Sequence, residues 1–229
     1  MSIQEATTST PTLTRLMAVG VWALPVYATL LAVSTLTHQP DYKADFAGYA
    51  DYVTTAQFLV SHVGASILGA ALGVIGIGSA AVLIAVPSGR PIRTLLGASF
   101  SVIGNVINTA VFGVAAFTQP AIGRAYQNGF ADIVVVNDDV YGAELIITAV
   151  VGLLFFITGA VLLGGSIRAT SPRLRLPGLA YATTIPLFVI AGFSFSTLQP
   201  VAAVALAAAT AMVARRLPAV LESEHSHPR

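Results

Sequence analysis

A histidine and two carboxylates lie within or beside apolar segments of this sequence, and these residue types can carry acid–base chemistry. His62 lies inside an uncharged run, and Glu144 lies near the start of another run that Asp139 directly precedes. A carboxyl group that stays protonated in a dry site can donate a proton, and an imidazole can accept one. Polar groups inside membrane spans are costly and indicate functional sites. We therefore expect His62, Glu144 and Asp139 to be catalytic.

Amide and phenol side chains can orient the oxygen of a bound molecule. Asn105 and Asn108 share one face of a predicted helix with Ser101, because positions i, i+4 and i+7 align. Tyr49 lies in the polar segment before the run that holds the histidine, and Tyr141 lies at the start of the run that holds the glutamate. We expect Asn105, Asn108, Tyr49 and Tyr141 to bind substrate. In the predicted topology, the outer half of the protein contains His62, Asn105, Asn108, Glu144, Tyr49 and Tyr141.

Each of these residues also fits a structural role. An intramembrane histidine can be a hydrogen-bonded packing group, and the two asparagines can join helices at about 0.6 kcal/mol for a typical interhelical bond. Asp138 and Asp139 directly precede an apolar run, where they would cap a helix and interact with its dipole. Glu144 would be solvated if it lies at the membrane interface. The sequence leaves the functional and the structural roles open.

The composition is that of a membrane protein. The chain has 229 residues, of which 55% are hydrophobic and 9% charged, and its mean hydropathy is +0.81. Ordinary soluble domains contain about 25% charged residues. Cysteine is absent, which excludes disulfides, Fe–S ligation and thiol chemistry. We expect no metal and no cofactor, because HExxH, Walker and dinucleotide motifs are missing, and no nucleic-acid partner, because no basic patch with interleaved aromatic residues occurs.

Six apolar runs predict six membrane-spanning helices, since about 20 helical residues cross a bilayer core. The runs are 16–36, 56–86, 94–117, 140–167, 178–198 and 201–213, the last of them short and rich in alanine. The fold class is therefore all-α. We expect a single transmembrane domain over 16–214 between cytoplasmic tails at 1–15 and 215–229. Whether the domain assembles into an oligomer stays open.

The distribution of charge predicts the orientation of the bundle. Arginines occur in every short connection on one side of the threading, and most aspartates occur in the two longer connections on the other side. Positively charged loops stay on the cytoplasmic side. We therefore expect both termini to be cytoplasmic in a multi-pass protein of the bacterial plasma membrane.

Three patterns describe how the spans are joined and packed. The first outer connection places Tyr42, Phe46, Tyr49 and Val53 at the spacing of an amphipathic helix, as a lid over the bundle or as an interfacial anchor. Ala65, Gly69 and Gly73 form a small-residue stripe that lets another helix approach closely. Gln-Pro pairs at 39–40, 119–120 and 199–200 each end an odd-numbered span and are consistent with three helical-hairpin repeats or with coincidence.

Four segments within residues 20–200 are similar to those of other membrane proteins. They are THQPDYKADFAGYADYV, QFLVSHVGASILGAALG, FGVAAFTQPAIGRAY and DDVYGAELIITAVVG. Together they resemble a broad group of actinobacterial polytopic membrane proteins. That resemblance implies the six-span topology and brings no reaction with it. In kind only, a small cysteine-free bundle with intramembrane carboxylate and imidazole resembles the membrane-embedded terpene cyclases. No motif here matches theirs residue by residue.

The leading hypothesis is a protein that binds or converts an apolar small molecule, such as a lipid or an isoprenoid, in an outward-facing polar cavity. Conversion would be cyclase-type acid–base chemistry, and the partners would be membrane lipid and this substrate. One alternative is a transporter of protons or small solutes, which would need polar groups at both depths. Another is an accessory subunit, whose small-residue stripe would face outward rather than into its own bundle.

Overall fold

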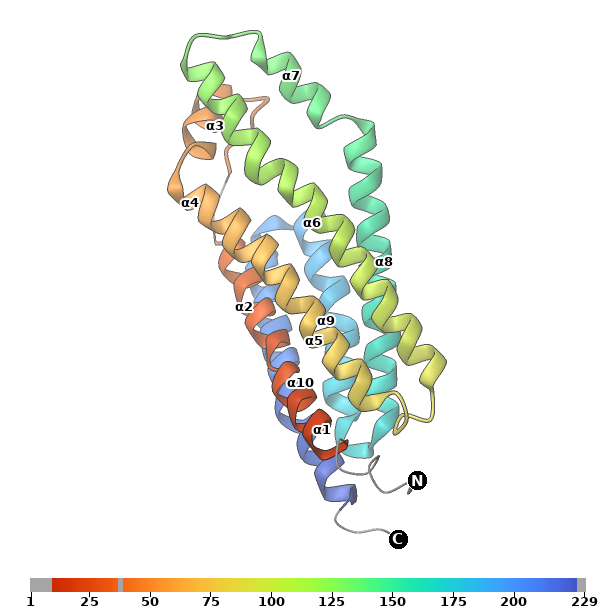
Figure 1. The fold of residues 1–229 in the computed structure, drawn as a ribbon. Helices are drawn as coiled ribbons and strands as arrows, with labels where there is room; N and C mark the ends of the chain where they lie inside the picture. Colours follow the sequence, from red (N-terminus) through yellow and green to blue (C-terminus); the bar gives the residue numbers. More distant parts are fainter. Residues whose placement is uncertain (1–9, 37–38, 226–229) are drawn as a thin grey trace, which may run out of the picture.

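The computed structural model describes residues 10–36 and 39–225, and within them six helices are long and apolar enough to cross a membrane. In chain order the elements are α1 (Thr10–Gly20), α2 (Ala23–Ser34), α3 (Phe46–Val53), α4 (Ala56–Leu59), the π-helix η2 (Val60–Leu68), α5 (Gly69–Ile84), α6 (Pro91–Gln127), α7 (Ile133–Val140), α8 (Ala143–Thr170), the 3-10 helix η3 (Pro172–Leu174), α9 (Arg175–Ser194), the 3-10 helix η4 (Ser196–Leu198) and α10 (Gln199–His225). They form one elongated bundle in which α1 and the end of α10 lie at the same end (Figure 1). The prediction of an all-helical bundle with six helices of membrane-spanning length is confirmed.

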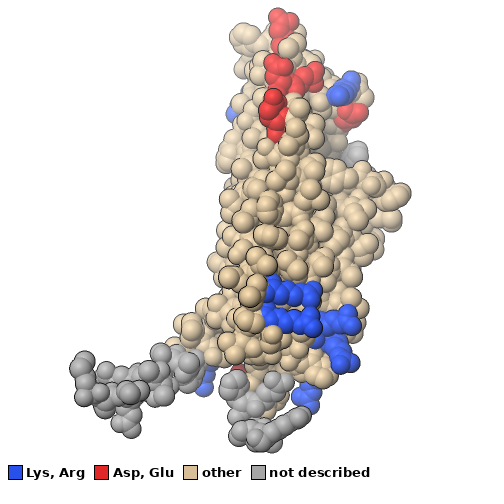
Figure 2. Space-filling view, turned by 90° about the vertical axis from the view of Figure 1, so that its right-hand side faces the viewer, with Lys and Arg blue, Asp and Glu red and all other residues tan. Residues whose placement is uncertain are grey.

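Charged side chains gather near the two ends of the bundle and leave an apolar belt between them (Figure 2). The acidic end consists of α3, α7 and their flanking segments, where the aspartates lie. The basic end consists of the starts of α6 and α9 and the ends of α8 and α10, where most arginines lie. Large apolar side chains such as Val106, Leu154 and Leu187 are exposed on the belt. The belt is therefore suited to contact with lipid.

Helix α6 continues beyond the predicted end of the third span at Phe117 and spans 37 residues to Gln127. By helix rise this is about 55 Å, far longer than the hydrocarbon core of a bilayer. Proline lacks the N–H that a helix interior needs, yet Pro120 lies inside α6. The short helix α3 packs against these last turns, where Gly123 faces Val53 and Ala50. Tertiary packing at the acidic end thus maintains a helix that the Gln-Pro pair was expected to end.

The last hairpin also differs from the sequence prediction. Helix α10 begins at Gln199 and continues through Arg215 and Arg216 to His225, so the sixth span is not short. Pro200 lies in its first turn, where proline is tolerated because that N–H has no helical partner. The three Gln-Pro pairs therefore occupy different structural positions, since the second lies inside a helix and the third begins one.

Close helix contacts depend on glycines that face other helices. Gly69 and Gly73 of the predicted stripe are buried and face Tyr27 of α2. At the contact of α6 with α8, Gly97 and Gly104 face the backbone of α8, so a side chain at either position would overlap it. The stripe is therefore used within the bundle, which does not fit the expectation for an accessory subunit.

Candidate functional site

A cavity of about 600 Å³ opens in the half of the bundle nearer the acidic end. It lies where α2, α9 and α10 end or begin, and Figure 1 shows that the α9–α10 hairpin stops well short of α3 and α7. Its lining residues are Leu31, Ser34, Thr35, Leu36, Ser61, His62, Ser66, Asn108, Val111, Phe112, Ala149, Leu153, Phe188, Val189, Gly192, Phe193, Thr197, Gln199 and Pro200. None of these described residues is Asp, Glu, Lys or Arg. The wall is thus apolar with neutral hydrogen-bonding groups, the usual character of a small-molecule site.

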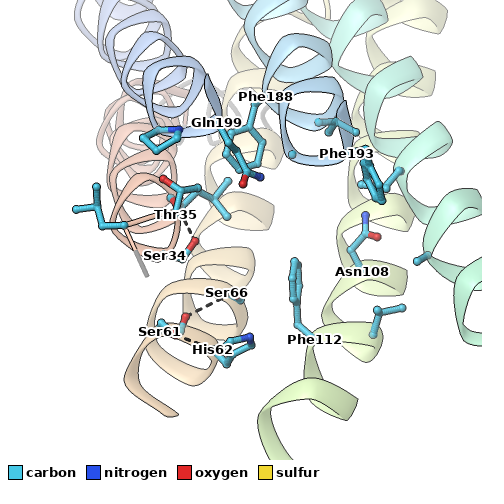
Figure 3. A pocket seen from close by; sticks show the side chains of 18 of the residues that line it. Ser34, Thr35, Ser61, His62, Ser66, Asn108, Phe112, Phe188, Phe193 and Gln199 are labelled. Atoms are coloured by element: carbon cyan, nitrogen blue, oxygen red, sulfur yellow. Dashed lines mark hydrogen bonds between the residues drawn. The ribbon is translucent and has the colours of Figure 1, made fainter. Parts of the chain in front are cut away.

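The residues Ser61, His62 and Ser66 come from the π-helix η2, which interrupts the rod formed by α4 and α5. In an α-helix, positions five residues apart point in different directions, whereas a π-helix aligns them. The Oγ of Ser66 accordingly donates to the carbonyl oxygen of Ser61 at 3.5 Å. The π-winding therefore brings Ser61 to the same wall as His62 and Ser66 (Figure 3). π-Segments inside α-helices frequently occur at functional sites.

The contacts of His62 Nδ1 indicate which ring nitrogen carries the proton. Its Nδ1 lies 3.0 Å from the carbonyl oxygen of Phe58. A carbonyl only accepts, so this bond requires the proton on Nδ1, and Nε2 of the neutral ring is then an acceptor. Ser61 Oγ donates to the same carbonyl at 2.8 Å and lies 3.1 Å from Nδ1. The ring also stacks on Phe58, with 4.0 Å between centroids. The imidazole is therefore held by its own helix and leaves Nε2 as an acceptor for a ligand.

The two asparagines of α6 have different roles. Asn108 lines the cavity together with Phe112, and both project from α6 on the side of the cavity opposite His62 (Figure 3). Asn105 does not line it and is buried. It accepts a hydrogen bond from Tyr27 Oη at 3.3 Å and donates to the carbonyl oxygen of Ala70 at 3.0 Å. Asn105 thus joins α2, α5 and α6, which is the structural role that the sequence left open.

The carboxylates expected to be catalytic lie outside the cavity. Glu144 is exposed in the first turn of α8, and Asp139 is exposed in α7. Neither belongs to the lining that contains His62. The capping interpretation of Asp138 and Asp139 is wrong, because both lie inside α7 and the N-cap of α8 is Gly142. The structure therefore does not bring the predicted acid and the predicted base together.

Tyr49 and Tyr141 belong to a packed cap at the acidic end rather than to the cavity. Tyr49 is fully buried and donates to Asn137 Oδ1 at 3.2 Å, which joins α3 to α7. Gln119 of α6 donates through Nε2 to the Tyr141 hydroxyl. Burial, followed by the nearby Tyr141 and Tyr42, raises the pKa of Tyr49 well above its usual range. The amphipathic stripe of the first connection therefore faces inward and holds this cap together.

A second groove of about 390 Å³ adjoins the cavity between α2 and η2. Leu36 and Ser61 line both hollows. The groove is otherwise mainly apolar, with exposed side chains such as Val33, Val60 and Leu68. The groove and the cavity therefore lie on two sides of Leu36 and Ser61.

Several lining residues were missed by reasoning from the sequence. Ser61 and Ser66 lie on different faces of a regular helix, and only the π-winding aligns them. Thr197 and Gln199 lie in the α9–α10 hairpin, at the junction of the fifth and sixth apolar runs. The Gln-Pro pair at 199–200 was noticed, but as a repeat and not as a lining segment.

Comparison of the chain with family models, curated proteins and solved structures gives no match. Function is therefore inferred from the geometry of the cavity.

Proposed function

We propose that the protein binds an apolar small molecule of the lipid or isoprenoid class in this cavity, and that the ligand carries a neutral hydroxyl or similar donor. The observation that carries the proposal is the lining itself. It is apolar, has no charged side chain among the described residues, and presents one oriented acceptor at His62 Nε2. A neutral wall of this kind favours a neutral ligand, because an unpaired charge is costly to bury.

We propose an orientation of the bundle from the distribution of its charges. Arginines at the basic end indicate that this end faces the cytoplasm of a bacterial cell, with both termini inside. The cavity then lies in the outer half of the plasma membrane. The lateral groove between α2 and η2 supports entry of the ligand from the bilayer rather than from water.

Binding has more support than conversion or transport. Acid–base conversion needs a proton donor within hydrogen-bond reach of the reacting atom, and His62 is the only titratable side chain in the described lining. Transport needs a path through the other half of the bundle. There Tyr27, Ile77, Phe156 and Tyr181 are buried in one continuous apolar core below the cavity.

Two substitutions of His62 test the proposal. The amide of glutamine reaches the position of Nε2, whereas the shorter asparagine ends near Nδ1. Losing one neutral hydrogen bond is worth about 0.5–1.5 kcal/mol, so His62→Asn should lower ligand retention about 2- to 12-fold. His62→Gln and the control Glu144→Gln should retain it. Mass spectrometry of extracts from the purified proteins measures the ratio of ligand to protein.

The proposal fails if the wild-type protein carries only bulk phospholipid. It also fails if His62→Asn retains as much of the apolar molecule as the wild-type protein does. If Glu144→Gln instead loses the ligand, the Glu144 carboxylate takes part in binding and the described site is wrong.

A further inference from the structure

Four arginines converge on a single hollow at the basic end. Arg90 precedes α6, Arg93 lies in its first turn, Arg168 lies near the end of α8 and Arg175 begins α9. Together with Gly165 and Ala169 they line a pocket of about 480 Å³, and none of its described lining residues is acidic. Figure 2 shows a group of Lys and Arg side chains on the face that it presents, toward the end of the bundle opposite the Asp and Glu cluster.

Arg93 is held in place before any ligand binds. Its Nε donates to the carbonyl oxygen of Leu162 in α8 at 3.3 Å, and the residue is half-buried. The guanidinium lies over Gly165, where even a Cβ atom would overlap it. A glycine at this position therefore provides the space that lets an arginine of α6 lie against α8. The N–H donors of a guanidinium fixed in this way match the oxygens of a phosphate.

The rule that cytoplasmic loops are basic explains arginines at this end but not their convergence. Like charges that share one hollow repel each other, and a bound anion would remove that repulsion. The neighbouring apolar surface indicates what kind of anion fits. Leu96, Val161 and Leu179 each lie one turn from the pocket toward the middle of the bundle, and all three are exposed. These side chains would lie beside acyl chains while the arginines contact a headgroup.

We propose that this arginine pocket binds the phosphate of an anionic phospholipid in the leaflet at the basic end. Basic pockets between transmembrane helices are a recognised type of site for anionic lipid headgroups. The site is separate from the cavity of His62, shares no lining residue with it and does not depend on the function proposed for that cavity.

The test compares lipids and arginines on the full chain in detergent. Phosphatidylglycerol, phosphatidylcholine and inorganic phosphate are added separately, and bound lipid is measured by native mass spectrometry. A charge-assisted hydrogen bond to phosphate predicts that Arg93→Gln and Arg168→Gln each weaken phosphatidylglycerol binding about 10- to 100-fold. The control Arg216→Gln removes the same charge at the same end but outside the pocket, and it should change binding less than about twofold.

Three results would overturn the proposal. Equal binding of phosphatidylglycerol and phosphatidylcholine would show no preference for an anion. Equal losses in Arg216→Gln and Arg93→Gln would show a general surface charge and no pocket. Displacement of the lipid by inorganic phosphate at similar concentration would identify a free anion as the ligand. Because the Arg168 side chain is exposed, its variant separates loss of binding from misfolding.

Discussion

Gly73 and Gly78 provide a matched test of the contact of α5 with α2, because both lie in α5 and face different surroundings. A Cβ on Gly73 would lie 2.8 Å from Cδ1 and Cε1 of Tyr27 and 2.9 Å from Nδ2 of Asn105. A Cβ on Gly78 would meet no atom within 4 Å. We predict that Gly73→Ala destabilises the bundle relative to Gly78→Ala.

The expected magnitude follows from these distances. Non-bonded carbon atoms are most favourable at about 3.5–4.0 Å, so the ring of Tyr27 must move by about 0.7–1.2 Å. The side-chain amide of Asn105 limits that movement, because it is hydrogen-bonded to both the Tyr27 hydroxyl and the Ala70 carbonyl oxygen. Overpacking of this kind costs about 1–3 kcal/mol. Alanine gains about 0.5–1 kcal/mol over glycine in a helix, but both variants share this gain, so it cancels in the comparison.

Thermal unfolding in detergent measures the difference. For a domain of this size, about 1–3 kcal/mol corresponds to a gap of about 2–12 °C between the two midpoints. Gly73→Ala should have the lower midpoint, and Gly78→Ala should equal or exceed the wild-type protein. If the two variants unfold at the same temperature, the described contact of α5 with Tyr27 is wrong.

Two further predictions concern topology and the acidic-end cap. A single cysteine introduced at Asn128 should react with an impermeant maleimide on intact cells, whereas one introduced at Ser223 should react only after lysis. The wild-type chain has no cysteine that would add to the signal. The reverse labelling pattern would show that the bundle has the opposite orientation in the membrane. Tyr49→Phe should destabilise the protein at neutral pH by about 1–3 kcal/mol, because Asn137 Oδ1 loses its donor. Since burial raises the pKa of Tyr49 above its ordinary value of 10.0, stability should fall as the pH rises beyond that value. Unfolding midpoints measured over this range should fall less steeply in Tyr49→Phe, and an unchanged slope would contradict the burial.

The membrane-spanning helices could be predicted from hydropathy, because the mean hydropathy of a segment depends only on its own amino-acid composition. Hydropathy ended the third span at Phe117, since Gln119 and Pro120 are poor signals for a continuing helix. The helix continues because α3 packs on it, and a contact between segments so far apart in the sequence cannot be read from either segment alone. The same holds for α7, which contains the aspartates that a linear reading assigned to the cap of α8.

The candidate site was predicted in part. His62 and Asn108 were selected as polar groups inside apolar runs, and the structure places both in one cavity. Glu144 was selected by the same rule, but its position along the helix left open whether it faces inward or outward, and it is exposed. Ser61 could not be assigned, because the change from α- to π-winding at Val60 rotates it into the cavity. Depth along a span was thus predictable, whereas direction around the helix was not.

Filling the cavity tests the proposed function most directly. Val111 lines the cavity, and Val106 lies on the same helix with 59% of its surface exposed on the apolar belt. The same large side chain can therefore be placed inside or outside the site by Val111→Trp and Val106→Trp. Both purified proteins are first checked for similar unfolding midpoints, and their extracts are then compared with the wild-type extract by mass spectrometry. We predict that Val111→Trp loses the apolar molecule and that Val106→Trp retains it. Equal retention in both variants would contradict the cavity as the binding site.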